Sequence, residues 1–495
     1  MSGNSKPGGK AGANWKAPAH RTGAQHAVYG REQELAELHE AYRWAAMGSS
    51  ELVVLSGPPG VGKSAVVLKA FRPDISARSY FAWGKFDAFS RSRPYGIWIQ
   101  CFRFLIRRLL TEPEERLNRW KARFSGLVGK NAAVIADDIP ELGLLFDGLP
   151  QAEPLPAREN QNRFELVFRR LVQTLASSRQ PLVLFLDDIQ WADRSSLQLL
   201  QSLIEDPESR HVCIICAYRD TERTEHAAWL ERWLSDETAG YSRRRIRLSH
   251  LGLADAQRWV ADELGMTGEA CFPLAHALFV KSVGNPFHLK QLLQTALEEG
   301  IIRRDADGNR WRWDGGRLER LPDIDGQIDY LVGKIKSLPG AASHLLARAS
   351  TLGGKFSSRL ASAVGGMDER TVIAHCEHAV QVGLLAVRGT EGDSVVYEFT
   401  HDQILHAASS LLDETERRRL HLAAGNHLLR ERDAGREAAD PYAIANHLNE
   451  AGDLLDDRLT EICILVNEEA GRLAMKSSDY ATALGHFRQA LERMG

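Results

Sequence analysis

The sequence lacks a strong charge of one sign, a long apolar run and a high cysteine content. Its 495 residues carry a formal net charge of −3, so no strong field favours nucleic acid or an anionic membrane as a partner. No apolar stretch approaches the ~18 residues of a membrane span, and the N-terminus has no apolar signal segment. Six cysteines do not make a disulfide framework in a chain of this length. We expect a cytoplasmic protein of several domains, because one core rarely grows past ~250–300 residues.

One cysteine pair has the C-x-x-C spacing of zinc and redox sites. Cys213 and Cys216 lie in an apolar run, residues 212–217, that predicts a buried strand. Successive side chains of a strand alternate between its faces, so the two sulfurs should point to opposite sides. No second Cys/His pair lies nearby in the sequence, and we expect neither a zinc site nor a redox site.

The strongest positive signal is a glycine-rich segment between a predicted strand, residues 52–55, and a predicted helix, residues 65–71. The segment matches G-x-x-x-x-G-K-[ST], whose glycines let backbone N–H groups point at phosphate oxygens. Lys63 would neutralise the β- and γ-phosphates, and the Ser64 hydroxyl would bind Mg²⁺. A chance turn is the alternative, and the flanking strand and helix weigh against it. The residues expected to contact the nucleotide are Gly57, Pro58, Pro59, Gly60, Val61, Gly62, Lys63, Ser64 and Ala65.

A second signal follows ~120 residues later, within the span of one nucleotide-binding domain. Five apolar residues, 182–186, predict a central parallel strand, and Asp187 and Asp188 come at its carboxyl end. Open α/β sheets bind their ligands at that edge. Asp187 would hold Mg²⁺ through water, and Asp188 would orient or deprotonate the attacking water.

Two arginines are further candidates. Arg219 ends the strand predicted over residues 212–217, where it could sense the γ-phosphate, although a surface ion pair with Asp220 is an alternative. Arg31 precedes an amphipathic helix that should pack beside the sheet, near the adenine end of the site. A plain surface arginine is the other interpretation of Arg31.

The sequence predicts an α/β fold, a three-layer P-loop NTPase domain with a parallel sheet, followed by mostly helical domains. Residues 1–26 are poor in large apolar residues and should form a disordered arm. The expected boundaries are 27–250 for the NTPase domain, 251–325 for a helical lid, 326–412 for a winged-helix-like domain and 413–495 for helices that begin a series of tetratricopeptide-like repeats. The arginine run at 243–245 is expected at a solvated edge. Residues 327–350 and 356–385 are expected to be helices, and residues 468–491 one tetratricopeptide-type helix pair. A lone repeat leaves apolar surface exposed, so we expect a partner or further repeats to cover it.

An ordered set of motifs resembles the STAND-type ATPases, the signal-transduction ATPases with numerous domains, within the AAA-like group. The set is similar to the ATPase module of large bacterial hybrid serine/threonine–histidine kinases. Besides the phosphate loop it comprises Gly30–Glu32, Gly84–Asp87, Pro94–Tyr95, Asn162–Phe164, Leu186–Asp193, Ala217–Asp220, Gly284–Phe287 and Phe399–Asp402.

The resemblance implies roles that spacing does not show. Arg31 would contact the adenine end, Arg219 would be the first sensor arginine, and Pro286 would pack on the nucleotide from the lid. His401 would touch the β-phosphate and hold a closed, ADP-bound form, whereas its sequence alone favours a core histidine. No protein-kinase motif set precedes the loop, so we expect no kinase activity from this chain.

Three functions are compatible with these features. The first is a slowly hydrolysing ATP/ADP switch with Mg²⁺, which passes a signal to a protein partner or signalling kinase through the C-terminal helices. The second is an oligomeric AAA-type ATPase that remodels a protein substrate, for which no arginine finger is identifiable. The third is an ATP-regulated transcription regulator, but residues 327–410 are not notably basic, and nucleic acid is not an expected partner. Homo-oligomerisation on ATP binding remains open.

Overall fold

The computed structural model describes residues 28–71, 79–86, 94–127, 139–145, 157–220, 229, 233, 241–305, 307, 310–323, 327–435, 440–476 and 479–494. The predicted arm, residues 1–26, lies outside these residues. A five-stranded parallel sheet has the strand order β2-β3-β4-β1-β5. Its strands are β1 (Ser50–Gly57), β2 (Tyr80–Lys85), β3 (Leu182–Asp187), β4 (Val212–Arg219) and β5 (Ser242–Arg247).

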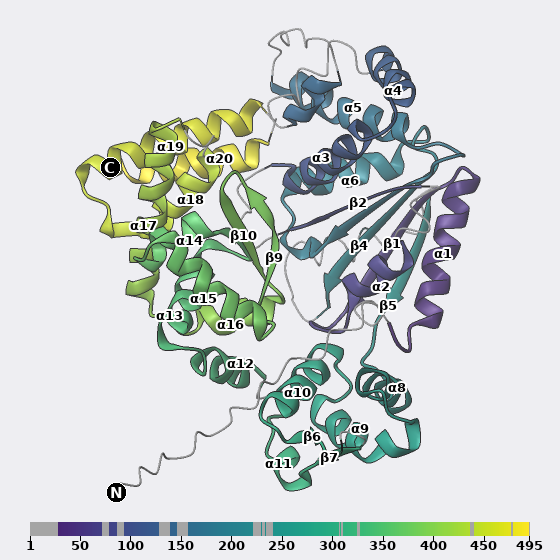
Figure 1. The fold of residues 1–495 in the computed structure, drawn as a ribbon. Helices are drawn as coiled ribbons and strands as arrows, with labels where there is room; N and C mark the ends of the chain where they lie inside the picture. Colours follow the sequence, from purple (N-terminus) through teal and green to yellow (C-terminus); the bar gives the residue numbers. More distant parts are fainter. Residues whose placement is uncertain are drawn as a thin grey trace, which may run out of the picture.

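Helices cover both faces of this sheet, and the result is three layers (Figure 1). Side chains alternate along each strand, so β1 gives Leu52 and Val54 to one core and Val53 and Leu55 to the other. The first core includes α3 (Gly96–Leu110), α5 (Ala157–Leu175) and α6 (Arg194–Glu205), and the second includes α1 (Glu32–Met47) and α2 (Lys63–Ala70). The predicted α/β architecture is confirmed. Other elements of this part are α4 (Glu114–Leu127), η3 (Pro140–Leu144) and η4 (Ile189–Trp191).

The cysteine pair illustrates the same alternation. Cys213 and Cys216 are both fully buried in β4, but Cys216 belongs to the core under α3 and Cys213 to the core under α1. Their opposite orientation is as predicted. Burial raises the pKa of both thiols, which keeps them protonated.

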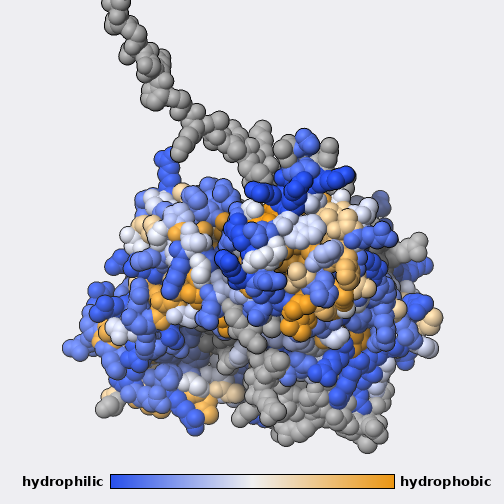
Figure 2. All heavy atoms as spheres, turned by 90° about the horizontal axis from the view of Figure 1, so that it is seen from below, coloured by the Kyte–Doolittle hydropathy of each residue, from blue (hydrophilic) through white to orange (hydrophobic). Residues whose placement is uncertain are grey.

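A helical segment after the sheet, residues 253–319, has its own core. It contains α8 (Leu253–Leu264), α9 (Gly268–Ser282), α10 (Pro286–Glu298), the paired strands β6 (Ile302–Arg304) and β7 (Trp311–Trp313), and α11 (Gly315–Glu319). It lies below the sheet in Figure 1, and Figure 2 views the molecule from that side, where hydrophobic patches interrupt a mostly hydrophilic surface.

The next segment, residues 327–409, combines helices with a three-stranded antiparallel sheet of order β8-β10-β9. Its elements are α12 (Gln327–Lys336), α13 (Gly340–Ala349), η6 (Ser350–Leu352), β8 (Lys355–Ser357), α14 (Ser358–Gly365), α15 (Glu369–Gln381), β9 (Leu385–Glu391), β10 (Ser394–Phe399) and α16 (Asp402–Ser409). Two expectations were too simple here. The helix expected over 327–350 is divided at Pro339, which starts α13 anew, and a strand, β8, opens the expected helical stretch 356–385.

Helices complete the described chain. They are α17 (Glu414–Asp433), α18 (Pro441–Ala451), η7 (Gly452–Leu454), α19 (Asp457–Lys476) and α20 (Tyr480–Glu492). The predicted helix pair at residues 468–491 corresponds to α19 and α20, where Gly471 leaves room for the ring of Phe487. The arginine run falls inside β5, an edge strand, and Arg244 in it forms an ion pair with Glu40. Within the described ranges, no helix has the length and apolar character needed to cross a membrane.

Candidate nucleotide site

The loop between β1 and α2 has the backbone geometry that phosphate binding requires. Gly57, Gly60 and Gly62 all have positive φ, 154°, 76° and 98°, which L side chains rarely adopt. Gly62 is the residue before α2, so the amino terminus of that helix opens into the loop. Backbone N–H groups and the helix dipole therefore both face the place where an anion would bind.

Lys63 is folded into the loop and almost completely buried. Its Nζ donates to the carbonyl oxygens of Gly57, at 2.8 Å, and Pro58, at 3.1 Å. Burial lowers the pKa of this ammonium, and the carboxylates of Asp187 and Asp188 partly offset the effect. An anionic ligand in the loop would favour its charged form.

Ser64 and Asp187 adjoin each other although 123 residues separate them in the chain. The Ser64 hydroxyl donates to Oδ2 of Asp187 at 2.5 Å. Burial and the neighbouring Asp188 raise the pKa of Asp187, so its negative charge is poorly compensated. A hydroxyl and a carboxylate are hard oxygen ligands of the kind Mg²⁺ prefers, and a divalent cation would relieve the buried charge. The two residues fit a magnesium site.

Asp188 does not face open solvent but lies in a charge cluster. Its backbone is left-handed, with φ 54°, and its carboxylate meets Lys85 Nζ at 3.1 Å and Arg219 Nε at 3.2 Å. The side-chain amide of Gln190 also donates to it, at 3.0 Å. With three donors around it, this carboxylate is held in place as an ion-pair acceptor.

Arg219 and Lys85 share a second carboxylate, which comes from the far end of the chain. Asp402, the first residue of α16, accepts from Lys85 Nζ at 2.9 Å through Oδ1 and from Arg219 Nη2 through Oδ2. Burial alone would raise the pKa of Asp402, but Lys85 and Arg219 outweigh it and keep the carboxyl ionised. Arg219 thus pairs with Asp188 and Asp402, and Asp220 pairs with Arg247.

The start of α10 contacts the loop directly. The side chain of Asn285 caps α10 by accepting from the backbone N–H groups of Phe287 and His288. Its Nδ2 also donates to the carbonyl oxygen of Pro59 at 3.0 Å. The Phe287 backbone N–H donates to Gly60 O at 3.2 Å. A Cβ on Gly60 would lie 2.9 Å from Asn285 Oδ1 and 2.9 Å from Phe287 Cβ. Pro286 stands between these two contact residues, at the first position of the helix.

Arg31 and His401 both lie among these elements. The guanidinium of Arg31 is buried and donates to the carbonyls of Val61, at 3.4 Å, and Ser249, at 2.5 Å. His401 stacks on Phe287 with 3.8 Å between ring centroids, and its Nδ1 accepts from the N–H of Gln403 at 3.2 Å. Burial lowers the pKa of His401 to about 4, so the ring is neutral at pH 7 and carries its proton on Nε2.

Lys85, Asp402 and Asn285 had no role assigned from the sequence. Each lies inside one of the motifs that resemble those of STAND-type ATPases. A single lysine, aspartate or asparagine at a helix or strand end is nevertheless common in proteins. Only the fold brings Lys85, at the end of β2, level with Asp187 at the end of β3.

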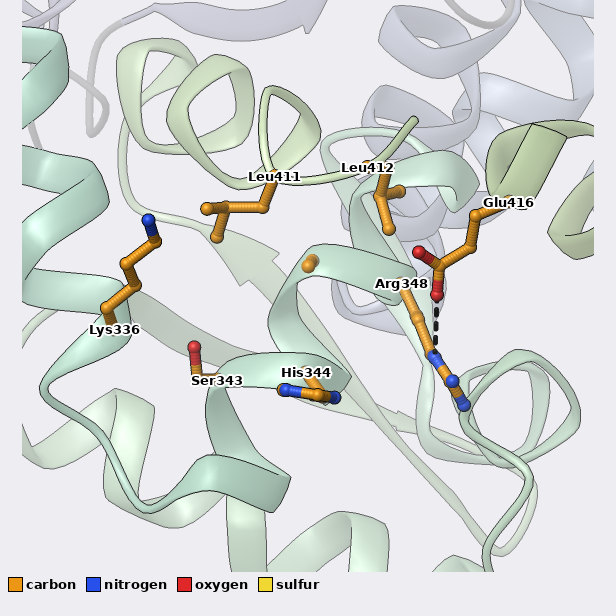
Figure 3. A pocket seen from close by; sticks show the side chains of 8 residues that line it. Lys336, Ser343, His344, Arg348, Leu411, Leu412 and Glu416 are labelled. Carbon is orange, nitrogen blue, oxygen red and sulfur yellow. Dashed lines mark ion pairs between the residues drawn. The ribbon is translucent and has the colours of Figure 1, made fainter. Parts of the chain in front are cut away.

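A cavity elsewhere in the molecule is separate from this site. It has a volume of about 240 Å³ and lies between α13 and the start of α17, where Arg348 points to Glu416 at 3.5 Å (Figure 3). No residue of the loop or the charge cluster lines it. The lining residues are Lys336, Ser343, His344, Ala347, Arg348, Leu411, Leu412 and Glu416.

Comparison with known proteins identifies one domain in the chain. Residues 27–215 match the AAA ATPase domain. The chain is 22% identical over 501 residues to the hybrid signal transduction histidine kinase G of Dictyostelium discoideum, covering 82% of this chain and 14% of that protein. It is 21% identical over 267 residues to histidine protein kinase 1 of Candida albicans, covering 48% of this chain and 11% of that protein. The chain thus spans a small part of both curated relatives.

Among solved structures, the fold is similar to a STAND protein with a tetratricopeptide repeat sensor from Pyrococcus horikoshii. The TM-score is 0.49 at 14% identity, over 95% of this chain and 58% of that one. The domain match spans the loop and both aspartates. Residues 27–215, with the phosphate loop between β1 and α2, are an AAA ATPase domain.

Proposed function

We propose that the chain is a signal-transduction switch that binds ATP and ADP with Mg²⁺ and hydrolyses ATP slowly. One observation carries the proposal. His401 and Asp402, more than 300 residues after the loop, lie on the same edge of the sheet as Lys63, Asp187 and Arg219. A helix that touches the nucleotide edge can respond to which nucleotide is bound.

Nucleotide binding begins with the loop. Its N–H groups and Lys63 would hold the β- and γ-phosphates, and Ser64 with Asp187 would hold Mg²⁺, which neutralises phosphate charge. Arg31 would support the adenine end indirectly, because it links Val61 of the loop to Ser249, which lies between β5 and the lid. Pro286 would pack on the nucleotide from the lid, residues 251–325.

The winged-helix-like domain, residues 326–412, would hold the closed form. Its His401 is neutral and carries a proton on Nε2, so it can donate to a β-phosphate oxygen in the presence of ADP. In the same arrangement the carboxylate of Asp188 is occupied by Lys85, Arg219 and Gln190, so it is poorly placed to activate water. Slow turnover is expected for a form with its base so restrained.

The C-terminal helices would carry the signal. Large apolar side chains remain exposed on α19 and α20, among them Leu465, Leu484 and Leu491. We propose that a protein partner or an attached signalling kinase covers this surface, inside the cytoplasm. An oligomeric AAA-type remodelling ATPase is the second candidate, favoured by the domain match alone.

The test is to purify the protein without added nucleotide, denature it and identify by chromatography what it releases. The switch predicts roughly one ADP per chain, carried through purification because the closed form retains it. His401→Ala should lose the ADP, whereas His406→Ala, an exposed histidine on the same helix, should keep it. Lys63→Ala should abolish nucleotide binding. An empty protein with rapid, steady ATP turnover would instead favour the remodelling ATPase.

A further inference from the structure

Two cations at the nucleotide edge, Lys85 and Arg219, are held by one carboxylate. Lys85 ends β2 and Arg219 ends β4, on either side of β3, which ends at Asp187. Asp402 gives one oxygen to each of them. Each cation therefore has one oxygen of the same anionic group, which is how two cations also bind a phosphate.

We propose that Lys85 is a second cation for the terminal phosphate of ATP, beside Arg219, and that Asp402 occupies the place of this phosphate in the closed form. The proposal rests on the switch function above. It adds a binding residue to the site, Lys85, and it makes Asp402 an internal competitor of the γ-phosphate.

Charge balance supports the competition. Lys85 and Arg219 bring two positive charges, and Asp188 and Asp402 bring two negative charges, so the cluster is neutral. A γ-phosphate that arrived while Asp402 remained would place further negative charge next to two carboxylates. If Asp402 leaves, Lys85 and Arg219 lose the negative charge that they share, which favours an incoming anion.

The positions of these side chains also allow a γ-phosphate to replace the carboxylate of Asp402. Asp188 holds Lys85 and Arg219 from the sheet itself, so both cations would stay at the edge after Asp402 departs. Asp402 belongs to a separate segment and is partly exposed, with 25% of its side chain accessible. ADP has no γ-phosphate and would leave the contact intact. The contact thus distinguishes the two nucleotides, as a ligand-driven shift between states requires.

The alternative is a fixed ion-pair network that only fastens the winged-helix-like domain. The two interpretations differ in one measurable quantity, the ratio of affinities for an ATP analogue and for ADP. A structural network would change both affinities together. Competition for Lys85 and Arg219 changes only the affinity for the nucleotide with a third phosphate.

The experiment measures dissociation constants of the full chain for ADP and for a non-hydrolysable ATP analogue, each with Mg²⁺. Lys85→Gln should weaken binding of the ATP analogue about tenfold more than binding of ADP, the usual scale for losing one charged contact. Lys85→Arg, which keeps the charge, should restore most of the loss. Asp402→Asn should shift the ratio the other way, towards the ATP analogue, because the competitor is gone.

A matched control and the contrary outcomes complete the design. Lys355→Gln removes a lysine from an exposed ion pair with Glu391, at 3.5 Å, that includes no residue of the loop or the charge cluster, and should leave both constants unchanged. Equal effects of Lys85→Gln on both nucleotides, or an unchanged ratio in Asp402→Asn, would overturn the inference while the switch stands. A wild-type chain that binds neither nucleotide would overturn the switch itself. If Asp402→Asn does not fold, the two Lys85 variants decide alone.

Discussion

Two segments contact the candidate nucleotide site, and they do so with different chemistry. The start of α10 uses uncharged hydrogen bonds, from Asn285 to Pro59 and from Phe287 to Gly60, together with close steric fit. The start of α16 uses the charge of Asp402. Neutral bonds to the loop backbone compete with nothing that a nucleotide brings. The charged contact engages groups that a phosphate also attracts, so only the second contact should respond to the ligand.

The largest expected effect comes from breaking the fit of α10. Gly60→Ala places a Cβ 2.9 Å from Phe287 Cβ and from Asn285 Oδ1, at a φ of 76° that already disfavours alanine. We expect a loss of about 3 kcal/mol in the free energy of unfolding without nucleotide, from left-handed strain and overpacking together. Denaturant unfolding monitored by tryptophan fluorescence measures it.

Gly62→Ala is the matched control for that variant. Gly62 has a comparable positive φ, 98°, but a Cβ there meets nothing within 4 Å. It should cost only the strain, about 1–2 kcal/mol. If the two variants lost equal stability, the close fit between Gly60 and α10 would have no energetic weight, and the contrast between the two contacts would fail.

The hydrogen bonds of Asn285 come next. Asn285→Ala removes the cap of α10 and the bond to Pro59 O, so we expect a loss of about 2 kcal/mol. Ser357→Ala, which removes only the uncharged side-chain cap of α14, should lose about 1 kcal/mol. The difference should persist in 1 M salt, because the Pro59 bond is uncharged. A difference that disappears in salt would mean that the α10 contact is electrostatic after all.

A smaller effect tests whether the two contacts are coupled. The ring of Phe287, on the α10 side, stacks on His401, on the α16 side. Phe287→Leu and His401→Leu, alone and together, form a double-mutant cycle whose coupling energy should be about 0.5–1.5 kcal/mol. Unfolding free energies at pH 7.5 give the four values. Strict additivity would mean that the two contacts open independently.

The sequence predicted the sheet well and the two contacts poorly, for a physical reason. Apolar runs such as residues 182–186 and the glycine spacing of the loop are local patterns, and local patterns determine strands and loop geometry. The partners of Asp402 are set by tertiary packing, 317 residues away in the case of Lys85. Arg219 was expected at the site, yet its partner Asp402 was noted only as part of a motif.

Strand β8 was missed for a related reason. Its three residues, Lys355–Ser357, are too short to show an alternating pattern, and they form a strand only because Tyr397 and its neighbours in β10 pair with them. The break at Pro339 has a different reason, because a proline disfavours helical backbone at the residue before it, and the expectation overlooked this local signal.

A pH dependence separates the two contacts once more. Burial lowers the pKa of His401 to about 4, while Asp402 opposes the shift and Lys85 and Arg219 add to it. Between pH 6.5 and about 4 the unfolded chain binds a proton at this histidine and the folded chain does not, so folding stability must fall as the pH falls.

His421 and His447, with pKa values lowered by burial to about 4 and about 3, add to the wild-type slope. The contribution of His401 is therefore the difference between the stability lost by the wild type and by His401→Gln from pH 6.5 to about 4, which should be about 1–3 kcal/mol. Asn285→Ala should keep the wild-type slope, because no group titrates in the bonds it removes. A slope that changed in Asn285→Ala and not in His401→Gln would reverse the assignment of charge-sensitive and charge-insensitive contacts.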